Sequence, residues 1–366
     1  MTDAPGESPR FSTRDLIVPT LFFLGALLLA AAFAMGPIVG SGLKKLPLTI
    51  DRTWVADGSD GTLVLDRCSL ERPTAQVLEA DVQQRQRSVA VRPADSNVVT
   101  VQAGTALGVD TYVLGGKSVD AKDVCAEPTL VATIDRVTLG RQSASPTGQS
   151  SIQYDDKRAA VDVPNRTGRT YVLPYGWAAP GDYFDVPTRT TVPLHDLGGM
   201  SIDGRDVRRL QAQVPETDLG SAGTDPRGVI RRPASWFGQF PGVAPNTELT
   251  AVLHYQSTRD LYVDERTGVV IDQRVDITES YRFTADEVAK YPALRDFALT
   301  NLRTVLTGDR QSRIDGANEA RDRARPVLLA TRVLPVASGT LGVLLLLCGL
   351  VLVVRSSRKS AHRTAP

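Results

Sequence analysis

The sequence predicts a mainly β (α+β) protein, in which an antiparallel β-sheet or barrel-like extracytoplasmic domain lies between two terminal transmembrane helices. Two observations predict this fold class. The 366-residue chain carries a long uncharged apolar stretch near each end, and short β-branched segments of alternating polarity dominate the roughly 290 residues between them. Strands and helices do not alternate in units of about 30 residues, so a parallel sheet is not expected.

The first apolar stretch runs from Leu16 to Val39, which is 24 residues without a charge. At about 1.5 Å per helical residue, it can cross a hydrocarbon core of roughly 30 Å. A cleavable signal peptide is the alternative, because Ala32-Phe33-Ala34 has the spacing of a cleavage site. The stretch stays apolar beyond that point, which favours an uncleaved transmembrane helix over 16–39, preceded by a cytoplasmic tail over 1–15.

The second apolar stretch, Val333 to Val354, predicts another transmembrane helix over 333–354, because core helices of soluble proteins rarely lack a polar face for 22 residues. The tail over 355–366 is basic, and the positive-inside rule therefore places both termini in the cytoplasm. Basic residues on the other side of each span oppose this orientation: Lys44, Lys45, Arg321, Arg323, Arg325 and Arg332. Long loops translocate largely regardless of charge, so we expect a plasma-membrane protein with two spans and a large extracytoplasmic domain.

The region over 40–283 is predicted to be a β-rich domain. Segments such as NVVTVQ (97–102), TLVATIDRVTL (129–139) and ELTAVLHYQ (248–256) alternate in polarity and are separated by turn-forming residues. In LYVDERTGVVIDQRVDI (261–277), aliphatic and charged residues alternate around Gly268, which suits a hairpin loop with positive φ. We interpret the charged residues of this segment as the solvated face of a hairpin and not as a catalytic cluster: Asp264, Glu265, Arg266, Asp272, Arg274 and Asp276.

The region over 284–332 is predicted to be helical and to lead as a stalk into the membrane. Thr284 and Glu287 form a capping box, which is typical of a helix N-terminus. Leu294, Phe297, Ala298, Leu302, Val305 and Leu306 then recur with helical spacing.

Cys68 and Cys125 are the two cysteines outside the predicted spans. Two is the number that a single disulfide needs, and an extracytoplasmic location would permit the bond. Two unrelated buried thiols are the alternative.

The sequence contains none of the common catalytic motifs. It lacks a nucleophile elbow, a P-loop, a glycine-rich dinucleotide fingerprint and a zinc-protease motif. The histidines of the central region, His195 and His254, lie far apart in the chain, and the net charge of +1 gives no indication of nucleic-acid binding. We therefore expect no enzymatic activity, no metal site and no cofactor.

The segment RRPASWFGQFPG (231–242) gathers three aromatic residues beside two arginines and two prolines. Amphipathic aromatic side chains next to arginines suit lipid headgroups, so this loop is the candidate lipid-contact site. A loop that packs its aromatic rings into the core is the alternative. The candidate lipid-contact residues are Arg231, Arg232, Trp236, Phe237 and Phe240.

Three segments carry a resemblance to a known family: 133–148 (TIDRVTLGRQSASPTG), 173–217 and 261–274 (LYVDERTGVVIDQR). Together with the plan of the ends, the chain resembles the PorA-like membrane proteins of actinobacteria, a family defined by a domain of unknown function. Some members are linked to lipoglycan assembly in the envelope. Glu265 departs from the family pattern, in which a proline is common at that position. The plan is also similar to that of class B scavenger receptors, which carry lipids through an apolar tunnel.

The resemblance implies a membrane-anchored cell-envelope protein whose outer domain binds or transfers a lipid or lipoglycan precursor. Its expected partners are membrane lipids or such precursors, and envelope biosynthesis enzymes are further candidates; no nucleic acid is expected. The alternatives are a porin- or channel-like envelope protein, which two helices could form only by oligomerising, and a structural partner of envelope-assembly enzymes. A hydrolase or transferase has no motif to support it.

Overall fold

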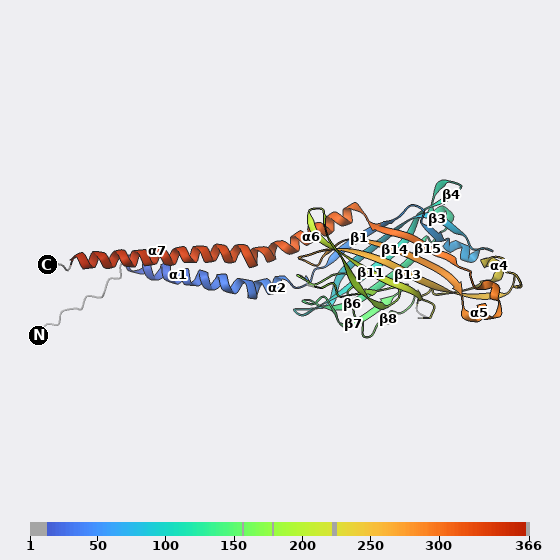
Figure 1. The fold of residues 1–366 in the computed structure, drawn as a ribbon, viewed down its shortest axis with the longest axis horizontal. Coiled ribbons are helices and arrows are strands. Elements are labelled where there is room, and N and C mark those ends of the chain that lie inside the picture. Colours follow the sequence, from blue (N-terminus) through green and yellow to red (C-terminus); the bar gives the residue numbers. More distant parts are fainter. Residues whose placement is uncertain (1–12, 156, 178, 222–224, 364–366) are drawn as a thin grey trace. The chain divides into compact units, whose positions relative to one another are not determined.

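The computed structural model describes residues 13–155, 157–177, 179–221 and 225–363. The chain divides into two compact units. One contains both chain ends, up to Lys44 and from Asp322, and the other is a β domain from Lys45 to Arg321 (Figure 1).

The membrane-anchoring unit is built from helices at both ends of the chain. At the N-terminal end, α1 (Thr13–Met35) continues through a π-helical turn over 36–40 into α2 (Ser41–Leu43). At the C-terminal end, α6 (Arg310–Leu328), whose residues up to Arg321 belong to the β domain, continues through a similar turn over 329–333 into α7 (Leu334–Arg363). The two helical stretches that are long and apolar enough to cross a membrane, among the described residues, are Leu16–Leu43 and Arg310–Ser356, each of which contains an 18-residue segment with a mean hydropathy of 2.5. The apolar helices predicted at the two ends are thus confirmed, and their orientation stays a prediction.

Glycines bring α1 and α7 together. A Cβ atom placed on Gly342 would lie 2.9 Å from the carbonyl oxygen of Gly25, and one placed on Gly25 would lie 2.7 Å from the side chain of Leu346. Only residues without a side chain let two helix backbones approach this closely, as is common between helices in membranes. The two helices therefore form a packed pair.

The β domain is a single antiparallel sheet of fifteen strands, which confirms the predicted mainly β fold class. Its main path runs β8-β7-β6-β4-β3-β1-β15-β14-β13-β11-β10-β9. We call the following strands the first wing: β1 (Asp51–Gly58), β3 (Val77–Ala94), β4 (Val98–Leu114), β6 (Thr129–Gly140), β7 (Pro146–Gln153) and β8 (Val161–Asp162). The second wing comprises β9 (Asp182–Asp185), β10 (Thr190–Ile202), β11 (Arg205–Asp218), β13 (Glu248–Asp264), β14 (Val270–Phe283) and β15 (Leu299–Gly308). Three short strands lie beside this path: β2 (Leu63–Leu65), β5 (Lys117–Asp120) and β12 (Val229–Pro233).

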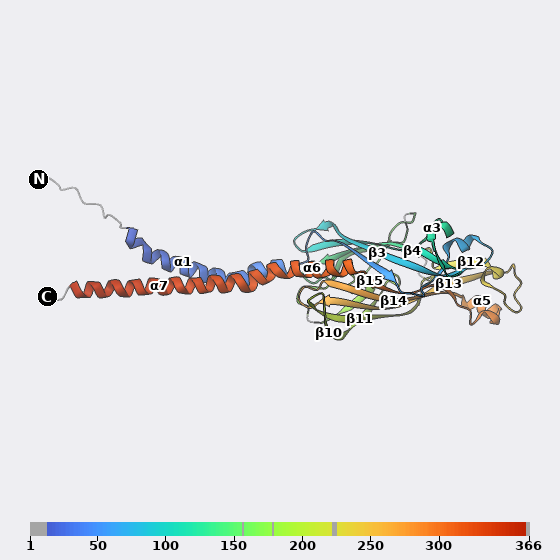
Figure 2. The ribbon, with the colours of Figure 1, turned by 90° about the horizontal axis from the view of Figure 1, so that it is seen from above.

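The sheet curls so that the inner faces of the two wings pack against each other (Figure 2). The largest hydrophobic cluster joins Trp54 and Leu107 of the first wing to Val275 and Ile277 of the second. Burying such side chains contributes roughly 1.5–3 kcal/mol each. The interior between the wings is therefore the core of the domain.

The two outer edges of the sheet also meet. Ile152 of β7 and Val163, which follows β8, share a buried cluster with Phe184 of β9. Between these edges, Arg166 is buried and makes a bidentate ion pair with Asp135 of β6, with N–O distances of 2.6 and 2.9 Å. Its guanidinium also lies 3.9 Å from the ring centre of Phe184. The ion pair and the apolar cluster hold the edges of the curled sheet together.

The segment over 261–277 forms the predicted hairpin of β13 and β14, with Gly268 at φ 70°. Arg274 and Asp276 are exposed, as predicted, but the interpretation of all its charges as solvated is wrong for Asp264 and Asp272, which are buried. Asp264 fastens the loop, because one carboxylate oxygen accepts from the backbone N–H of Thr267 at 2.8 Å. Beside Asp272, Ile271 of β14 shares a buried cluster with Ala317 and Ala320 of α6.

The predicted helical region over 284–332 is only partly helical. Thr284 caps the short helix α5 (Ala285–Lys290), and the stalk from Arg310 onward is helical, but 299–308 forms strand β15. The helical interpretation of Leu302 and Leu306 is wrong because a four-residue spacing also fits one side of a strand. In β15, Leu302, Thr304 and Leu306 are buried while Arg303 is exposed.

Cys68 and Cys125 form a disulfide across a sequence separation of 57 residues. Cys68 lies in the helical turn Arg67–Glu71 after β2, and Cys125 directly follows α3 (Ala121–Val124). The bond therefore ties together two connections of the first wing.

We predict that replacing both cysteines with alanine lowers the free energy of unfolding by roughly 4 kcal/mol, because the open loop regains chain entropy in the unfolded state. Urea unfolding of the full-length protein in detergent measures the change. Cys348→Ala, in the C-terminal helix, is the control and should leave the midpoint unchanged. An unchanged midpoint in the double variant would contradict the prediction.

Candidate functional site

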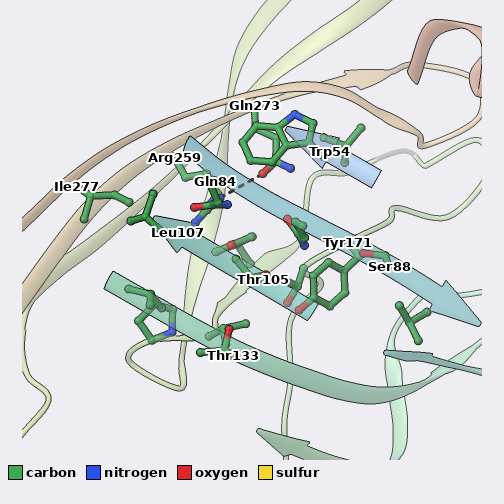
Figure 3. Close-up of a pocket in the computed structure, with 18 of the residues that line it drawn as sticks. Trp54, Gln84, Ser88, Thr105, Leu107, Thr133, Tyr171, Arg259, Gln273 and Ile277 are labelled. Carbon is green, nitrogen blue, oxygen red and sulfur yellow. Dashed lines mark hydrogen bonds between the residues drawn. The ribbon is translucent and has the colours of Figure 1, made fainter. Parts of the chain in front are cut away.

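A cavity of about 140 Å³ lies between the two wings (Figure 3). It is lined by inward-facing residues of β3, β4 and β6 on one side and of β13 and β14 on the other. The alternation of a strand decides which side chains reach it. On β3, Gln84, Gln86 and Ser88 line the cavity, whereas Arg85 and Arg87 are exposed on the outer face.

One side of this cavity is a wall of polar side chains without protein partners, which we call the polar wall. In the described part of the chain, these side chains form no hydrogen bond with another protein group, and they belong to Gln84, Gln86, Ser88, Thr105 and Thr133. Polar groups inside proteins are normally hydrogen-bonded, and those facing a polar cavity meet water or a ligand. The polar wall can therefore form hydrogen bonds with water or with a polar ligand in the cavity.

Arg259 of β13 faces the cavity with Gln273 of β14 (Figure 3). Its Nη1 donates to the Oε1 of Gln273 at 3.2 Å, and its guanidinium lies 5.3 Å from the ring centre of Tyr183. Burial by itself lowers the pKa of Arg259, but neighbouring groups, Tyr183 first among them, outweigh burial and raise it. Arg259 is thus a cation in the cavity at neutral pH.

Two ionisable side chains near Arg259, Tyr183 and Asp185, have pKa values that burial raises. Burial raises the pKa of Tyr183 to about 12, so its hydroxyl stays protonated at neutral pH. Asp185 is fully buried, and burial raises the pKa of its carboxyl group against the lowering effect of Arg259. One oxygen of Asp185 accepts from the backbone N–H and the hydroxyl of Thr188 at 3.1 and 2.9 Å. Asp185 is therefore engaged with its own loop.

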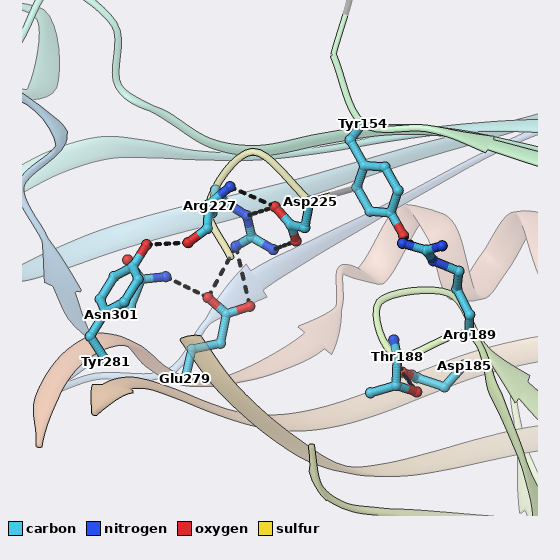
Figure 4. A network of polar contacts seen from close by, with 9 residues as sticks. All are labelled: Tyr154, Asp185, Thr188, Arg189, Asp225, Arg227, Glu279, Tyr281 and Asn301. Carbon is cyan, nitrogen blue, oxygen red and sulfur yellow. Dashed lines mark hydrogen bonds and ion pairs between the residues drawn. The ribbon is translucent and has the colours of Figure 1, made fainter. Parts of the chain in front are cut away.

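A second polar cluster at the cavity is fully satisfied (Figure 4). Arg227 lies between Asp225 and Glu279, at N–O distances of 3.0 and 3.1 Å, and all three are buried. Asn301 donates to Glu279 at 2.5 Å, and the hydroxyl of Tyr281 donates to the carbonyl of Arg227 at 2.7 Å. Burial alone would lower the pKa of Arg227, but the carboxylates of Glu279 and Asp225 have the larger combined effect and raise it. This cluster fastens the loop before β12 to the sheet and leaves no free group for chemistry.

The structure gives the aromatic loop a packing role. Trp236 and Phe237 of α4 (Ala234–Phe237) are buried, and Phe240 is half-buried in a cluster with Phe283 and Phe297. The indole N–H of Trp236 donates to the carbonyl of Ser69 at 2.9 Å.

The two arginines beside this loop differ in their surroundings. Arg232 donates from its Nε to the carbonyl of Leu70 at 3.0 Å, while Arg231 is exposed. Together with the buried rings, these contacts favour the core alternative. Contact of these five residues with lipid stays a prediction.

The two histidines show no catalytic arrangement. His195 is exposed on β10, and His254 places its Nδ1 3.0 Å from a carboxylate oxygen of Glu216. Neither belongs to a group of three possible metal ligands within the described ranges.

The sequence reasoning missed the polar wall and Arg259. The available signal was the segment VQQRQRSV (82–89), which is polar on both faces although it lies in a long strand. A strand with no apolar face indicates that its inner side does not pack in a dry core.

We predict that Arg227→Met lowers the free energy of unfolding by about 3–5 kcal/mol, because it leaves two buried carboxylates without their cation. Urea unfolding of the full-length protein in detergent measures the loss. Arg303→Met on the exposed side of β15 is the matched control, and we expect a change within about 0.5 kcal/mol. Equal stabilities of the two variants would show that the cluster does not depend on Arg227.

Comparison with known proteins identifies relatives along nearly the whole chain. A family model described as Porin PorA matches residues 18–351. A protein named Porin PorA from Corynebacterium resistens is 25% identical over an alignment 426 positions long, which covers 96% of this chain and 100% of the relative. The match includes the apolar helices, the β domain and every residue of the cavity.

Proposed function

This chain belongs to the Porin PorA family, and we propose that it is a channel-like envelope protein whose β domain receives small polar solutes in its cavity. The observation that carries the proposal is the polar wall, where five side chains face the cavity without a hydrogen-bond partner among the described residues. The porin name of the family and of its Corynebacterium member supports the same function.

The size of the cavity favours a small guest. A water molecule occupies about 30 Å³ in the liquid, whereas sites for drug-sized ligands measure about 300–1,000 Å³. The cavity of about 140 Å³ therefore suits a hydrated ion or a small solute.

Two helices cannot enclose a water-filled path, so conduction requires several copies of the chain. The packed pair of α1 and α7 would be the unit that repeats around such a path. The conductance should accordingly rise more steeply than in proportion to the protein concentration.

We predict that Thr133→Phe reduces the single-channel conductance of the full-length protein in planar bilayers at least fivefold, because the ring fills the cavity. Ala132→Phe is the matched control: the neighbouring residue is exposed on the outer face of the same strand, so we expect wild-type conductance. Equal conductance in the two variants would show that the solute does not pass through the cavity. The absence of conductance from the wild type at any protein concentration would refute the proposed function.

We further propose that both termini are cytoplasmic and that the β domain is extracytoplasmic in the plasma membrane. The basic tail after α7 and the disulfide, which needs an oxidising compartment, support this orientation. We expect a phosphatase fused after Pro366 to be inactive and one inserted after Gly116, in the turn between β4 and β5, to be active. The reverse pattern in intact cells would overturn the topology.

Binding of a lipid or lipoglycan precursor is a second candidate function. Aliphatic side chains, including Leu107, Ile277 and Leu302, share the lining of the cavity with the polar wall. A whole acyl chain would need more room than about 140 Å³, so the wings would have to separate. Mass spectrometry of lipids that co-purify with the full-length protein decides this: a stoichiometric lipid together with no conductance favours the lipid function.

A further inference from the structure

We propose that Arg259 makes the cavity a recognition site for a small oxyanion, a carboxylate or a phosphate group, whose other polar atoms are received by the polar wall. This inference rests on the proposed function and names the class of solute. Three observations support it: the charges of the side chains that line the cavity, the unused N–H groups of Arg259, and the polar wall on the other side of the same cavity.

The cavity has three lining arginines, and two of them have carboxylate partners. Arg227 pairs with Asp225 and Glu279, and Arg52 places its Nη1 3.5 Å from a carboxylate oxygen of Glu319. Arg259, in contrast, has no carboxylate within ion-pair distance among the residues that the structure describes. The cavity therefore contains one guanidinium whose charge is not balanced by a direct contact.

The donors of Arg259 are largely unused. A guanidinium presents five N–H groups in a planar fork that fits carboxylate and phosphate oxygens. Arg259 uses its Nη1 for Gln273, and its Nε is buried without a partner in the described structure. A buried cation with unsatisfied donors is costly, and an oxyanion would supply both the missing charge and the missing acceptors.

Asp185 does not take this role. Its Oδ2 is engaged with Thr188, and Tyr255 approaches its Oδ1 at 3.5 Å. Burial raises the pKa of this carboxyl group, whereas the charge of Arg259 lowers it. The face of the Tyr183 ring beside Arg259 stabilises the cation without neutralising it.

The polar wall completes the site. Gln84 and Ser88 of β3 and Thr133 of β6 line the same cavity as Arg259, and none of these side chains has a protein partner in the described ranges (Figure 3). Hydroxyl and amide groups can accept or donate hydrogen bonds, so they suit the hydroxyls or bound water of a solute. The preferred guest is thus a small hydroxylated carboxylate or phosphate.

Equilibrium dialysis of radiolabelled inorganic phosphate against the full-length protein in detergent tests the site. We expect saturable binding to the wild type that weakens with salt, and at least a 30-fold lower affinity in Arg259→Gln. Arg259→Lys keeps the charge but loses the fork, so its affinity should fall between the two. Arg303→Gln, an exposed arginine on β15, should bind as the wild type does.

Circular dichroism and the melting temperature confirm that each variant is folded, and Arg259→Lys decides the outcome if Arg259→Gln is not. An unchanged affinity in either Arg259 variant, or no phosphate binding to the wild type, overturns the inference.

Reversal potentials under a potassium acetate gradient separate this failure from failure of the proposed function. Conductance that Thr133→Phe reduces, but that shows no preference for acetate over potassium, refutes the oxyanion site alone. Absence of conductance from the wild type refutes the proposed function, and the phosphate-binding measurement then decides the oxyanion site by itself.

Discussion

The closure of the β domain depends on Arg166, which pairs with Asp135 of β6 near one edge of the curled sheet and lies against the ring of Phe184 in β9 at the other edge. An open sheet of this length would end in two rows of unpaired backbone groups. The chain instead returns after β8 through Asn165, a residue type that tolerates the positive φ observed there, and inserts Arg166 between β6 and the ring of Phe184. The hydroxyl of Tyr171 donates to the same carboxylate at 2.6 Å, so the charges are well satisfied. Removing one partner of such a buried pair would leave an uncompensated charge between the edges.

The cavity is a consequence of that closure. Once the wings face each other, every second residue of β3, β4 and β6 points inward, and the sequence fills several of these positions with amides and hydroxyls. Packing these positions with aliphatic residues would have produced a drier and more stable core. The apolar cluster that includes Trp236 and Phe237 reaches the cavity, because Leu107 and Ile277 belong to the cluster and also line the cavity.

Much of the fold could be predicted from the sequence because its signals are local. The unbroken apolar stretches identify the helices at the ends, alternation identifies most strands, and Gly268 marks the hairpin. Strand β15 was mistaken for helix because Leu302 and Leu306 have a spacing that both structures share. The site could not be predicted from local sequence patterns, because Gln84 and Arg259 come together only through the curl of the sheet. In the same way, Asp264 is buried in contact with Arg205 of another strand. The aromatic loop is conspicuous in the sequence because three large rings lie close together, whereas the polar wall consists of ordinary polar residues spread over three strands.

The pairing of β1 with β15 has a consequence for biogenesis. Ala56 lies opposite Gly308, so the strand that begins the sheet is completed by the strand made last. Contacts between such distant parts of a chain form slowly, because the long intervening loop must close first. During synthesis, both wings therefore keep unpaired strand edges until Leu299–Gly308 has left the ribosome. The C-terminal helices α6 and α7 follow this strand. A nascent chain of this design stays vulnerable to aggregation and proteolysis for nearly its whole translation time.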